Sequence, residues 1–115
     1  MFEDNNTRKA IITNVIDGDT FEADVNLGYG VTVNLRFRLF SVNTPEVFGT
    51  EKEKGIVSKE FVVKQFLNKT VIIIDKGLDS FRRNLADVYF DDNGVQASFG
   101  ELLCNQGLAE KKIYK

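Results

Sequence analysis

Apolar and polar residues alternate along the first part of the chain, and the alternation is clearest between positions 31 and 40. There, valine, leucine and phenylalanine occupy the odd positions, while polar residues, among them Arg36 and Arg38, occupy most of the even ones. A period of two is typical of a β-strand, because successive side chains point to opposite faces, and it places both arginines on one face. Turn residues separate this segment from two earlier segments rich in β-branched and aromatic residues. The pattern predicts an antiparallel meander of three strands, at residues 10–16, 20–26 and 31–42.

The pattern changes after Pro45. Residues 46–55 end in a run of alternating charges and are predicted to form a loop. Apolar residues between 56 and 67 then recur at a spacing that approximates one wide face of an amphipathic helix. Two apolar segments that follow, at 70–75 and 85–90, are typical of strands.

The C-terminal part of the chain carries clear turn and capping signals. The Asp-Asp-Asn-Gly sequence at 91–94 predicts a hairpin turn into another strand at 95–97. Ser98, with Glu101 three residues later, forms a capping box. A second helix is therefore predicted from this point to the neighbourhood of Gly107, a residue type that commonly ends helices.

Short, mostly consecutive strands combined with two helices describe a small barrel of the OB type. The predicted fold class is mainly β with helices (α+β), a five-stranded OB-type β-barrel with two to three flanking helices. The length fits one domain over residues 1–115, in which residues 1–9 are predicted to be a flexible N-terminal tail. Ten phenylalanines and no tryptophan predict a core built on Phe, Val, Ile and Leu.

The composition excludes several kinds of active site. The chain has no histidine, which excludes Ser-His-Asp and Cys-His nucleophile pairs and histidine-ligated metals. Its single cysteine, Cys104, excludes an intrachain disulfide and a cysteine-only zinc site. Catalysis must therefore rely on carboxylates, arginines, lysines, tyrosines, hydroxyls or a hard cation held through oxygen atoms. We expect no histidine-like inflection near pH ~6.5 in an activity profile.

Hydropathy and charge set expectations for location and partners. The longest uninterrupted apolar stretch, residues 71–74, is far shorter than the ~20 residues of a membrane span, so no membrane partner is expected. The acidic start does not resemble a signal peptide, which predicts a cytoplasmic protein by default, or a secreted or surface protein if a leader has been removed. The net charge of −2 gives no overall attraction for nucleic acid, so binding would need a local basic cluster. The lysines that could form such a rim are Lys9, Lys52, Lys54, Lys111, Lys112 and Lys115.

Three segments place functional groups close together in the sequence. The Ile-Asp-Gly-Asp-Thr sequence at 16–20 is most simply a hairpin turn, in which the glycine supplies a positive φ and Asp19 caps the backbone. Residues 37–46 gather an arginine, an amide, hydroxyls and a carboxylate around one strand end, and residues 79–85 form a basic loop. Four of the five arginines lie in or beside the last two segments: Arg36, Arg38, Arg82 and Arg83. This concentration favours a planar anion such as phosphate, which arginine binds through two hydrogen bonds.

Together these segments supply the groups that metal-assisted phosphodiester cleavage needs. Carboxylate, amide and carbonyl oxygens suit Ca²⁺, which takes ~6 to 8 oxygen ligands at about 2.3 to 2.6 Å. Two arginines can neutralise the charge that builds on a five-coordinate phosphorus. A glutamate can orient or deprotonate the attacking water.

The sequence resembles the staphylococcal nuclease (thermonuclease) domain family. The resemblance runs from about residue 10 to residue 115 and rests on four ordered segments, at 16–20, 37–46, 79–86 and 106–109. It implies an OB-type barrel that uses Ca²⁺ to hydrolyse the phosphodiester bonds of DNA, RNA or both, and that leaves 3′-phosphates. It also implies an endonuclease that acts as a monomer on single-stranded or frayed nucleic acid.

The same resemblance assigns catalytic roles to three residues. Arg38 and Arg83 would bind the scissile phosphate, and Arg83 would also assist the leaving group. Glu46 would be the general base. Further contacts with the substrate are expected from Arg36, Arg82, Phe81 and Tyr114.

The implied Ca²⁺ ligands are Asp19, Asn43 and Thr44, the last through its backbone carbonyl. Asn43 is a departure, because the best-known family member has aspartate at this position. Asp19, Asn43 and Glu46 therefore carry a charge of −2 where that member has −3. An amide oxygen still coordinates Ca²⁺, so we expect a weaker site that is nevertheless retained.

Two other interpretations remain open at the level of the sequence. One is a non-catalytic OB-type domain that binds single-stranded nucleic acid or a protein ligand, and the other is a purely structural domain of this fold. Domains of this type that have lost catalysis usually lack one or more of Arg38, Glu46 and Arg83, and this chain retains all three. The acidic net charge favours the binding domain, because weak attraction for nucleic acid makes a poor general nuclease.

Overall fold

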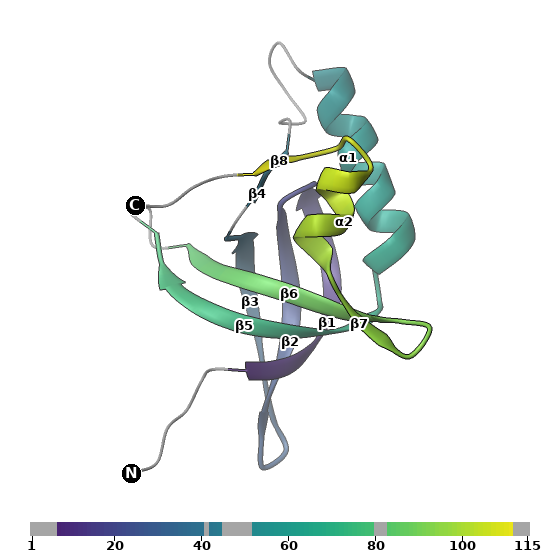
Figure 1. Cartoon of the computed structure of the whole chain (residues 1–115). Coiled ribbons are helices and arrows are strands. Elements are labelled where there is room, and N and C mark those ends of the chain that lie inside the picture. Colours follow the sequence, from purple (N-terminus) through teal and green to yellow (C-terminus); the bar gives the residue numbers. More distant parts are fainter. Residues whose placement is uncertain (1–6, 41, 45–51, 80–82, 112–115) are drawn as a thin grey trace.

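The computed structural model describes residues 7–40, 42–44, 52–79 and 83–111, which form eight strands and two helices (Figure 1). In chain order the strands are β1 (Thr7–Asp17), β2 (Thr20–Gly28), β3 (Val31–Leu39), β4 (Val42–Asn43), β5 (Thr70–Leu78), β6 (Asn84–Asp92), β7 (Val95–Ser98) and β8 (Glu110–Lys111). The helices are α1 (Lys52–Phe66), between β4 and β5, and α2 (Phe99–Asn105), between β7 and β8.

Five of these strands close into a barrel. They are hydrogen-bonded in the order β3-β2-β1-β5-β6, and a parallel pairing of β3 with β6 closes the sheet, with Phe37 opposite Asn84 and Leu39 opposite Ala86. Strand β7 extends the sheet beyond β6, and β4 and β8 form a separate two-stranded ladder. The predicted fold class, mainly β with an OB-type barrel and flanking helices, is confirmed.

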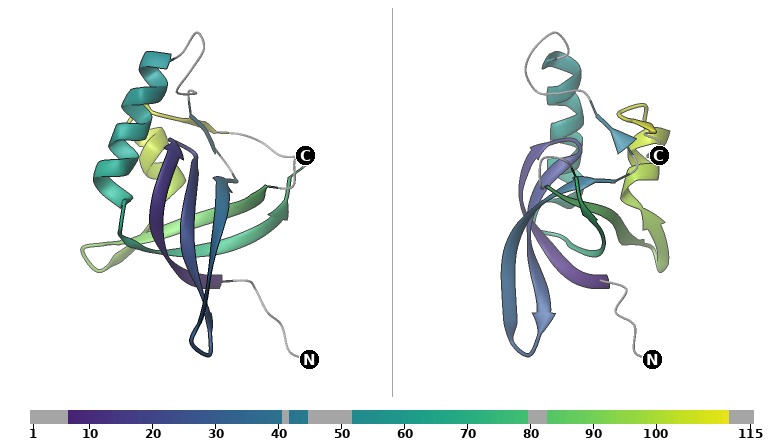
Figure 2. Two further views of the ribbon diagram at one scale, coloured as in Figure 1. Left: turned by 180° about the vertical axis from the view of Figure 1, so that it is seen from behind. Right: turned by 90° about the vertical axis from the view of Figure 1, so that its left-hand side faces the viewer.

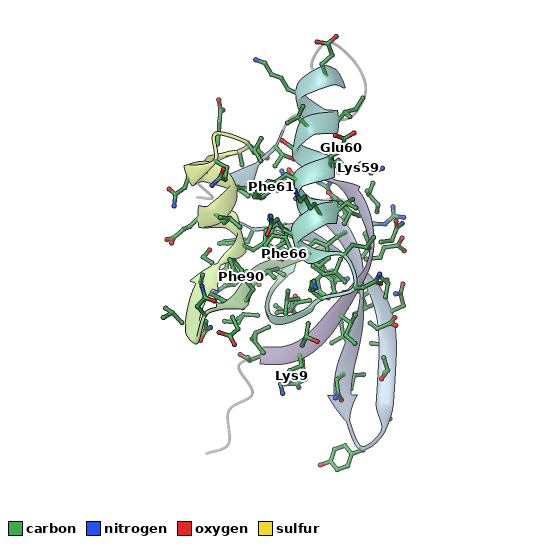
Figure 3. The ribbon with its side chains drawn as sticks, turned by 90° about the vertical axis from the view of Figure 1, so that its right-hand side faces the viewer. Lys9, Lys59, Glu60, Phe61, Phe66 and Phe90 are labelled. Atoms are coloured by element: carbon green, nitrogen blue, oxygen red, sulfur yellow. The ribbon has the colours of Figure 1, made fainter. Side chains whose placement is uncertain are left out.

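Phenylalanine rings form the centre of the core. Phe21 on β2 stacks on Phe37 of β3, with ring centroids 5.8 Å apart, and on Phe99 of α2 at 6.1 Å. Phe66 at the end of α1 lies 4.0 Å from Phe99 and meets Phe90 edge-on at 5.1 Å. Figure 3 shows Phe66 and Phe90 between the two helices and the barrel. One aromatic cluster therefore packs both helices on the sheet. The buried core consists mainly of Phe, Val, Ile, Leu and Ala, so the predicted Phe-, Val-, Ile- and Leu-based core is confirmed.

Helix α1 begins at Lys52, earlier than the predicted start at residue 56. Part of the charge run assigned to a loop over 46–55 is therefore helical, and residues 46–51 lie outside the described part of the chain. The apolar face is narrower than predicted, because Ile56 and Val57 are 36% and 54% exposed while Val62 is buried. Within the described ranges, neither helix is long and apolar enough to cross a membrane.

Several strands are longer than the sequence pattern predicted, among them β1 and β5. Strand β1 begins at Thr7, which pairs with Ile74 of β5. Residues 7–9 of the predicted flexible tail therefore belong to the barrel, and residues 1–6 lie outside the described residues. Strand β5 continues to Leu78, beyond the predicted end at residue 75.

The predicted strand at 31–42 is divided in two. Strand β3 ends at Leu39, whose backbone N–H donates to the carbonyl of Asp19 at 2.9 Å, and Phe40 N–H donates to the carbonyl of Ala86 at 2.8 Å. These bonds hold the end of β3 against two neighbouring segments.

Strand β4 then pairs with β8, with Val42 opposite Lys111 and Asn43 opposite Glu110. Figure 2 shows this ladder beyond the end of β3, on the same side of the barrel as the two helices. The sequence did not predict β8, because two residues are too few to show a period.

Candidate functional site

The structure gathers predicted site residues at the end of the barrel where β3 finishes. Asp19 lies in the turn between β1 and β2, and Arg38 near the end of β3, opposite Thr20 of β2. Asn43 ends β4, and Thr44 follows it. Segments that are far apart in the sequence therefore meet at one end of the barrel (Figure 2).

The turn between β1 and β2 is shaped by close packing. Asp17 Oδ1 accepts a hydrogen bond from Asp19 N–H at 3.2 Å, so the backbone cap expected from Asp19 comes from Asp17. The positive φ predicted for Gly18 is wrong, because Gly18 is not among the residues with a left-handed backbone. A Cβ at Gly18 would instead lie 2.8 Å from Thr44 Oγ1 and 2.9 Å from Ser58 Cβ, so Thr44, which follows β4, or Ser58 of α1 would have to shift. Glycine is therefore required because the turn packs directly against Thr44 and Ser58.

The Asp19 carboxylate is buried and fully engaged. Its residue is only 6% exposed. Oδ2 accepts hydrogen bonds from Arg38 Nη2 at 3.3 Å and from the backbone N–H of Thr44 at 3.1 Å. Oδ1 accepts one from Thr20 Oγ1 at 3.2 Å. Donors from the β1–β2 turn, from β3 and from the segment after β4 therefore hold this carboxylate in one orientation.

Arg38 links the other polar groups at this end of the barrel. Its Nη1 donates to the carbonyl of Leu39 at 3.0 Å, and its Nη2 donates both to Asp19 Oδ2 and to Asn43 Oδ1. A single nitrogen of the Arg38 guanidinium thus bonds both to an oxygen of Asp19 and to an oxygen of Asn43. Of the two arginines that the strand pattern placed on one face, Arg38 is 7% exposed and Arg36 is exposed.

Asp17 brings a second carboxyl group to the turn. Burial, together with the hydrogen bond to Asp19 and the nearby Asp19 charge, raises the pKa of Asp17 to about 7. A protonated carboxyl relieves the repulsion between two acidic groups in a partly dehydrated turn. A carboxyl group, in a chain without histidine, is therefore expected to titrate near neutral pH.

Arg83 is held by a local contact just before β6. Its Nε donates to Asp79 Oδ2 at 2.7 Å, and its backbone N–H donates to Asp79 Oδ1 at 2.8 Å. The backbone N–H of Asp79 donates in return to the carbonyl of Arg83 at 2.9 Å. The next residue, Asn84, donates its side-chain amide to the carbonyl of Arg36 on β3 at 3.3 Å. Arg83 therefore lies beside the strand that carries Arg36 and Arg38.

The remaining predicted residues lie outside the described part of the chain: Glu46, Phe81, Arg82 and Tyr114. Their assigned roles stay predictions. Asp79 received no role from the sequence, and its spacing of four from Arg83 predicts a contact only on a helix, whereas both residues lie outside α1 and α2.

Comparison with known proteins gives the class of this domain. Residues 36–115 match the family described as staphylococcal nuclease homologue. The chain belongs to the staphylococcal nuclease family. It is also 30% identical to an uncharacterized protein of Methanocaldococcus jannaschii, over 89% of this chain and 58% of that protein. The chain thus spans a little more than half the length of this relative.

Membership of the staphylococcal nuclease family indicates a nuclease-like or nucleic-acid-binding function. Domains of the family are typically hydrolases that use Ca²⁺, so the oxygen donors of this site can be tested against that ion. The carboxylate of Asp19 and the amide oxygen of Asn43 converge on a point where a positively charged nitrogen of Arg38 is already bound. Asp19 and Asn43 are oxygen donors of the type that Ca²⁺ takes, but the point between them is occupied by Arg38, and among the described residues no group of three or more Asp, Glu or Cys side chains gathers that could hold a metal.

A pocket of about 220 Å³ opens beside these donors. It is bounded by β4 with Thr44, by Lys54 of α1, and by the segment 107–110 that leads into β8. The Oγ1 atom of Thr44 is buried and, within the described residues, has no hydrogen-bond partner. This hydroxyl is turned towards Gly18 of the β1–β2 turn, where a Cβ would lie 2.8 Å from it, so it belongs to the packing of the turn.

Proposed function

We propose that this chain is a Ca²⁺-dependent endonuclease, active as a monomer, that hydrolyses single-stranded or frayed DNA or RNA and leaves 3′-phosphates. One observation carries the proposal. The arginine assigned to the phosphate, Arg38, contacts both Asp19 and Asn43, the side chains assigned to the cation. Phosphate binding and cation binding therefore depend on one set of side chains, as metal-assisted cleavage requires.

In this proposal Asp19 and Asn43 hold Ca²⁺ through their side-chain oxygens, with Thr44 contributing its backbone carbonyl. Bound Ca²⁺ would supply positive charge next to the phosphate and the attacking water. The N–H of Thr44 and the hydroxyl of Thr20 keep the Asp19 carboxylate oriented through hydrogen bonds at 3.1 and 3.2 Å. The carboxylate is thus oriented in advance, and its bond to Arg38 rearranges when a cation binds.

The two arginines act on the phosphate from different sides. Arg38, held through the carbonyl of Leu39, presents its guanidinium beside the cation ligands. Arg83 is held by Asp79 through Nε, and its side chain is 40% exposed. A guanidinium oriented in this way donates two parallel hydrogen bonds to phosphate oxygens, and these strengthen as negative charge builds in the transition state.

Glu46 follows Asn43 by three residues and completes the proposed mechanism. Its carboxylate accepts a proton from water, the water oxygen bonds to phosphorus, and the bond from phosphorus to the 5′ oxygen breaks. Arg83 hydrogen-bonds to the leaving oxygen, which takes a proton from solvent. The products are a 3′-phosphate and a 5′-hydroxyl.

Cleavage of single-stranded DNA and RNA, measured with Ca²⁺ or with chelator, tests this function. We expect cleavage only with Ca²⁺, and a loss of about 10²- to 10³-fold in kcat for Arg38→Ala and for Arg83→Ala. Glu46→Gln should also be impaired, while Glu60→Gln, an exposed change on α1, serves as the matched control. Cleavage that persists in chelator, or in the Arg38→Ala, Arg83→Ala double variant, contradicts the mechanism.

A second function, binding of nucleic acid without cleavage, is favoured by the burial of Arg38. Its side chain is only 9% exposed and bonds to Asp19 and Asn43. A phosphate could reach this guanidinium only after these bonds rearrange. Fluorescence anisotropy with labelled single-stranded DNA and RNA distinguishes the two functions: tight binding with no cleavage in Ca²⁺ supports the binding domain.

A further inference from the structure

We propose that Asn43 and Glu110 recognise a guanine base of the substrate, in the cavity of about 220 Å³ beside β4. This inference rests on the proposed function, because it names the base that a single-stranded substrate places next to the scissile phosphate. Both residues line the cavity, and Glu110 of β8 lies directly opposite Asn43 of β4. Residues directly opposite on antiparallel strands have Cβ atoms about 4.5 to 5.5 Å apart and side chains on the same face. Asn43 and Glu110 can therefore contact one ligand together.

The bond to Arg38 determines which group Asn43 offers to a ligand. Arg38 Nη2 donates to the Asn43 side chain, and a guanidinium has no acceptor, so the amide presents its oxygen there. The other end of the same amide, Nδ2, carries two N–H donors. Asn43 is exposed, and within the described ranges its Nδ2 has no acceptor. Asn43 therefore offers a hydrogen-bond donor to a ligand in the cavity.

Glu110 adds two acceptors beside this donor. Its side chain is exposed, and Lys54 of α1 is the basic residue that lines the same cavity. In the part of the chain that the structure describes, neither Glu110 nor Lys54 is engaged in an ion pair. An ionised carboxylate accepts hydrogen bonds through both oxygens and donates none. Asn43 and Glu110 together thus present one donor and two adjacent acceptors.

Among the nucleobases, guanine has the edge that complements this arrangement. Its Watson–Crick edge carries, in order, the O6 acceptor, the N1–H donor and the N2–H donor. On the same edge every other base places an acceptor beside its N–H donor, and the second carboxylate oxygen would repel that acceptor. Single-stranded nucleic acid leaves this edge unpaired, so a protein can read it through hydrogen bonds. The Asn43 donor facing O6, with Glu110 accepting from N1–H and N2–H, therefore selects guanine.

The rest of the cavity suits a planar ring. A water molecule takes up about 30 Å³ of the liquid, so a cavity of about 220 Å³ holds a group several times larger. Gly107, Leu108 and Ala109 contribute to its wall, and a Cβ added at Gly107 would meet nothing within 4 Å. Small and apolar residues of this kind let a base pack against the wall. Lys54 supplies a positive charge for the phosphate of the same nucleotide.

The backbone beside Glu110 is anchored by both helices, and the cavity adjoins the residue assigned to the phosphate. Leu108 N–H donates to the carbonyl of Leu103 in α2 at 2.9 Å, and the carbonyl of Leu108 accepts from the buried Ser58 of α1 at 3.0 Å. Arg38, which the proposed function places on the scissile phosphate, bonds directly to Asn43. A base in the cavity therefore belongs to a nucleotide beside the scissile bond, at one fixed position relative to the cut.

Fluorescence anisotropy in the presence of chelator tests this recognition without cleavage. The probes are short labelled single strands of thymidylate or uridylate that carry one central guanine, hypoxanthine or adenine. We expect guanine to be bound about tenfold more tightly than adenine. Hypoxanthine, which lacks the N2 amino group, should fall between them. The preference is expected in the DNA and RNA series alike, because the base edge is the same.

Three variants assign the preference to its residues. Glu110→Gln replaces one acceptor with a donor and should reduce the ratio of guanine to adenine affinity to below about twofold. Asn43→Asp removes the donor to O6 and should also lower this ratio. Glu60→Gln, which removes an exposed carboxylate of α1 outside this cavity, is the matched control and should leave the ratio unchanged. The ratio is compared because removing a negative charge strengthens binding to every nucleic acid alike.

The outcomes separate this inference from the proposed function. Equal affinities of the wild type for guanine and adenine overturn the inference, even where the protein cleaves nucleic acid in Ca²⁺. A ratio that Glu110→Gln leaves unchanged, together with a lower melting temperature of this variant, assigns Glu110 to an ion pair with Lys54 and also overturns the inference. A guanine preference that depends on Glu110, with no cleavage in Ca²⁺, supports the inference and contradicts the proposed nuclease. A wild type that neither binds nor cleaves these strands overturns both.

Discussion

The two arginines of the site are held in opposite ways. The Arg38 side chain is 9% exposed, and its partners come from the β1–β2 turn, from β3 and from β4. The Arg83 side chain is 40% exposed, and Asp79, four residues earlier, binds both its Nε and its backbone N–H. The first arrangement requires the assembled barrel, whereas the second can form within one loop.

This difference predicts that Arg38 contributes to the stability of the fold, whereas the contact with Asp79 mainly orients the Arg83 side chain. A buried guanidinium compensates a buried carboxylate, so the loss of either leaves an uncompensated charge in a poorly hydrated place. An exposed ion pair contributes little to stability, because water screens it. Arg38 is therefore expected to act in folding and in function, and Arg83 chiefly in function.

The largest expected effect is on stability. Arg38→Ala should lower the free energy of unfolding by about 3 kcal/mol, because Asp19 remains buried without its cationic partner. Arg83→Ala should lower it by less than about 1 kcal/mol. Urea denaturation at neutral pH without Ca²⁺ measures the free energy of unfolding of both variants. Equal decreases in the two variants would contradict the proposed difference between Arg38 and Arg83.

A smaller effect is expected from pH. The pKa of Asp17 is raised from 3.8 to about 7 in the folded protein, so the native state binds more protons than the unfolded state between these values. The contribution of Asp17 to stability without Ca²⁺ is therefore fully present below about pH 4 and is lost as the pH rises through about 7. Asp17→Asn should flatten this part of the profile, and Glu60→Gln should leave it unchanged. A difference in stability between the wild type and Asp17→Asn that stays constant across this window contradicts the assignment.

The packing of the β1–β2 turn gives a further prediction. In Gly18→Ala the new Cβ meets Thr44 and Ser58 at under 3.0 Å, so Thr44 must shift, at a cost of about 1 to 3 kcal/mol. Gly28→Ala is the control, because its φ of 83° is unfavourable for alanine, by about 1 kcal/mol, but nothing lies within 4 Å. Only Gly18→Ala should also weaken Ca²⁺ binding. Equal Ca²⁺ affinities in the two variants would show that the packing of the β1–β2 turn does not affect the cation site.

The sequence predicted the local features of this site better than the tertiary ones. Alternation in β3 indicated that Arg36 and Arg38 share a face, but the burial of Arg38 depends on β4 and the β1–β2 turn folding over it. The ladder that places Glu110 opposite Asn43 is two residues long and leaves no periodic signal. Gly18 was assigned a conformational role from its turn motif, although its neighbours Thr44 and Ser58 are more than 20 residues away along the chain.

The smallest effect on stability is expected from a substitution of Asp79. This position therefore allows the orientation of Arg83 to be tested with little change in folding. Asp79→Asn removes the charge that holds Arg83 Nε and keeps an oxygen for the backbone N–H of Arg83, so the free energy of unfolding should change by less than about 1 kcal/mol. The kcat of cleavage should nevertheless fall about tenfold with little change in KM. A guanidinium that is no longer held in place still binds the substrate but stabilises the transition state less well than the oriented one. In the Arg83→Ala background the same substitution should have no further effect on kcat, because Asp79 acts only through Arg83. An equal loss of activity in both backgrounds would mean that Asp79 acts on the substrate by another route, and the local pair would then be more than a support for Arg83.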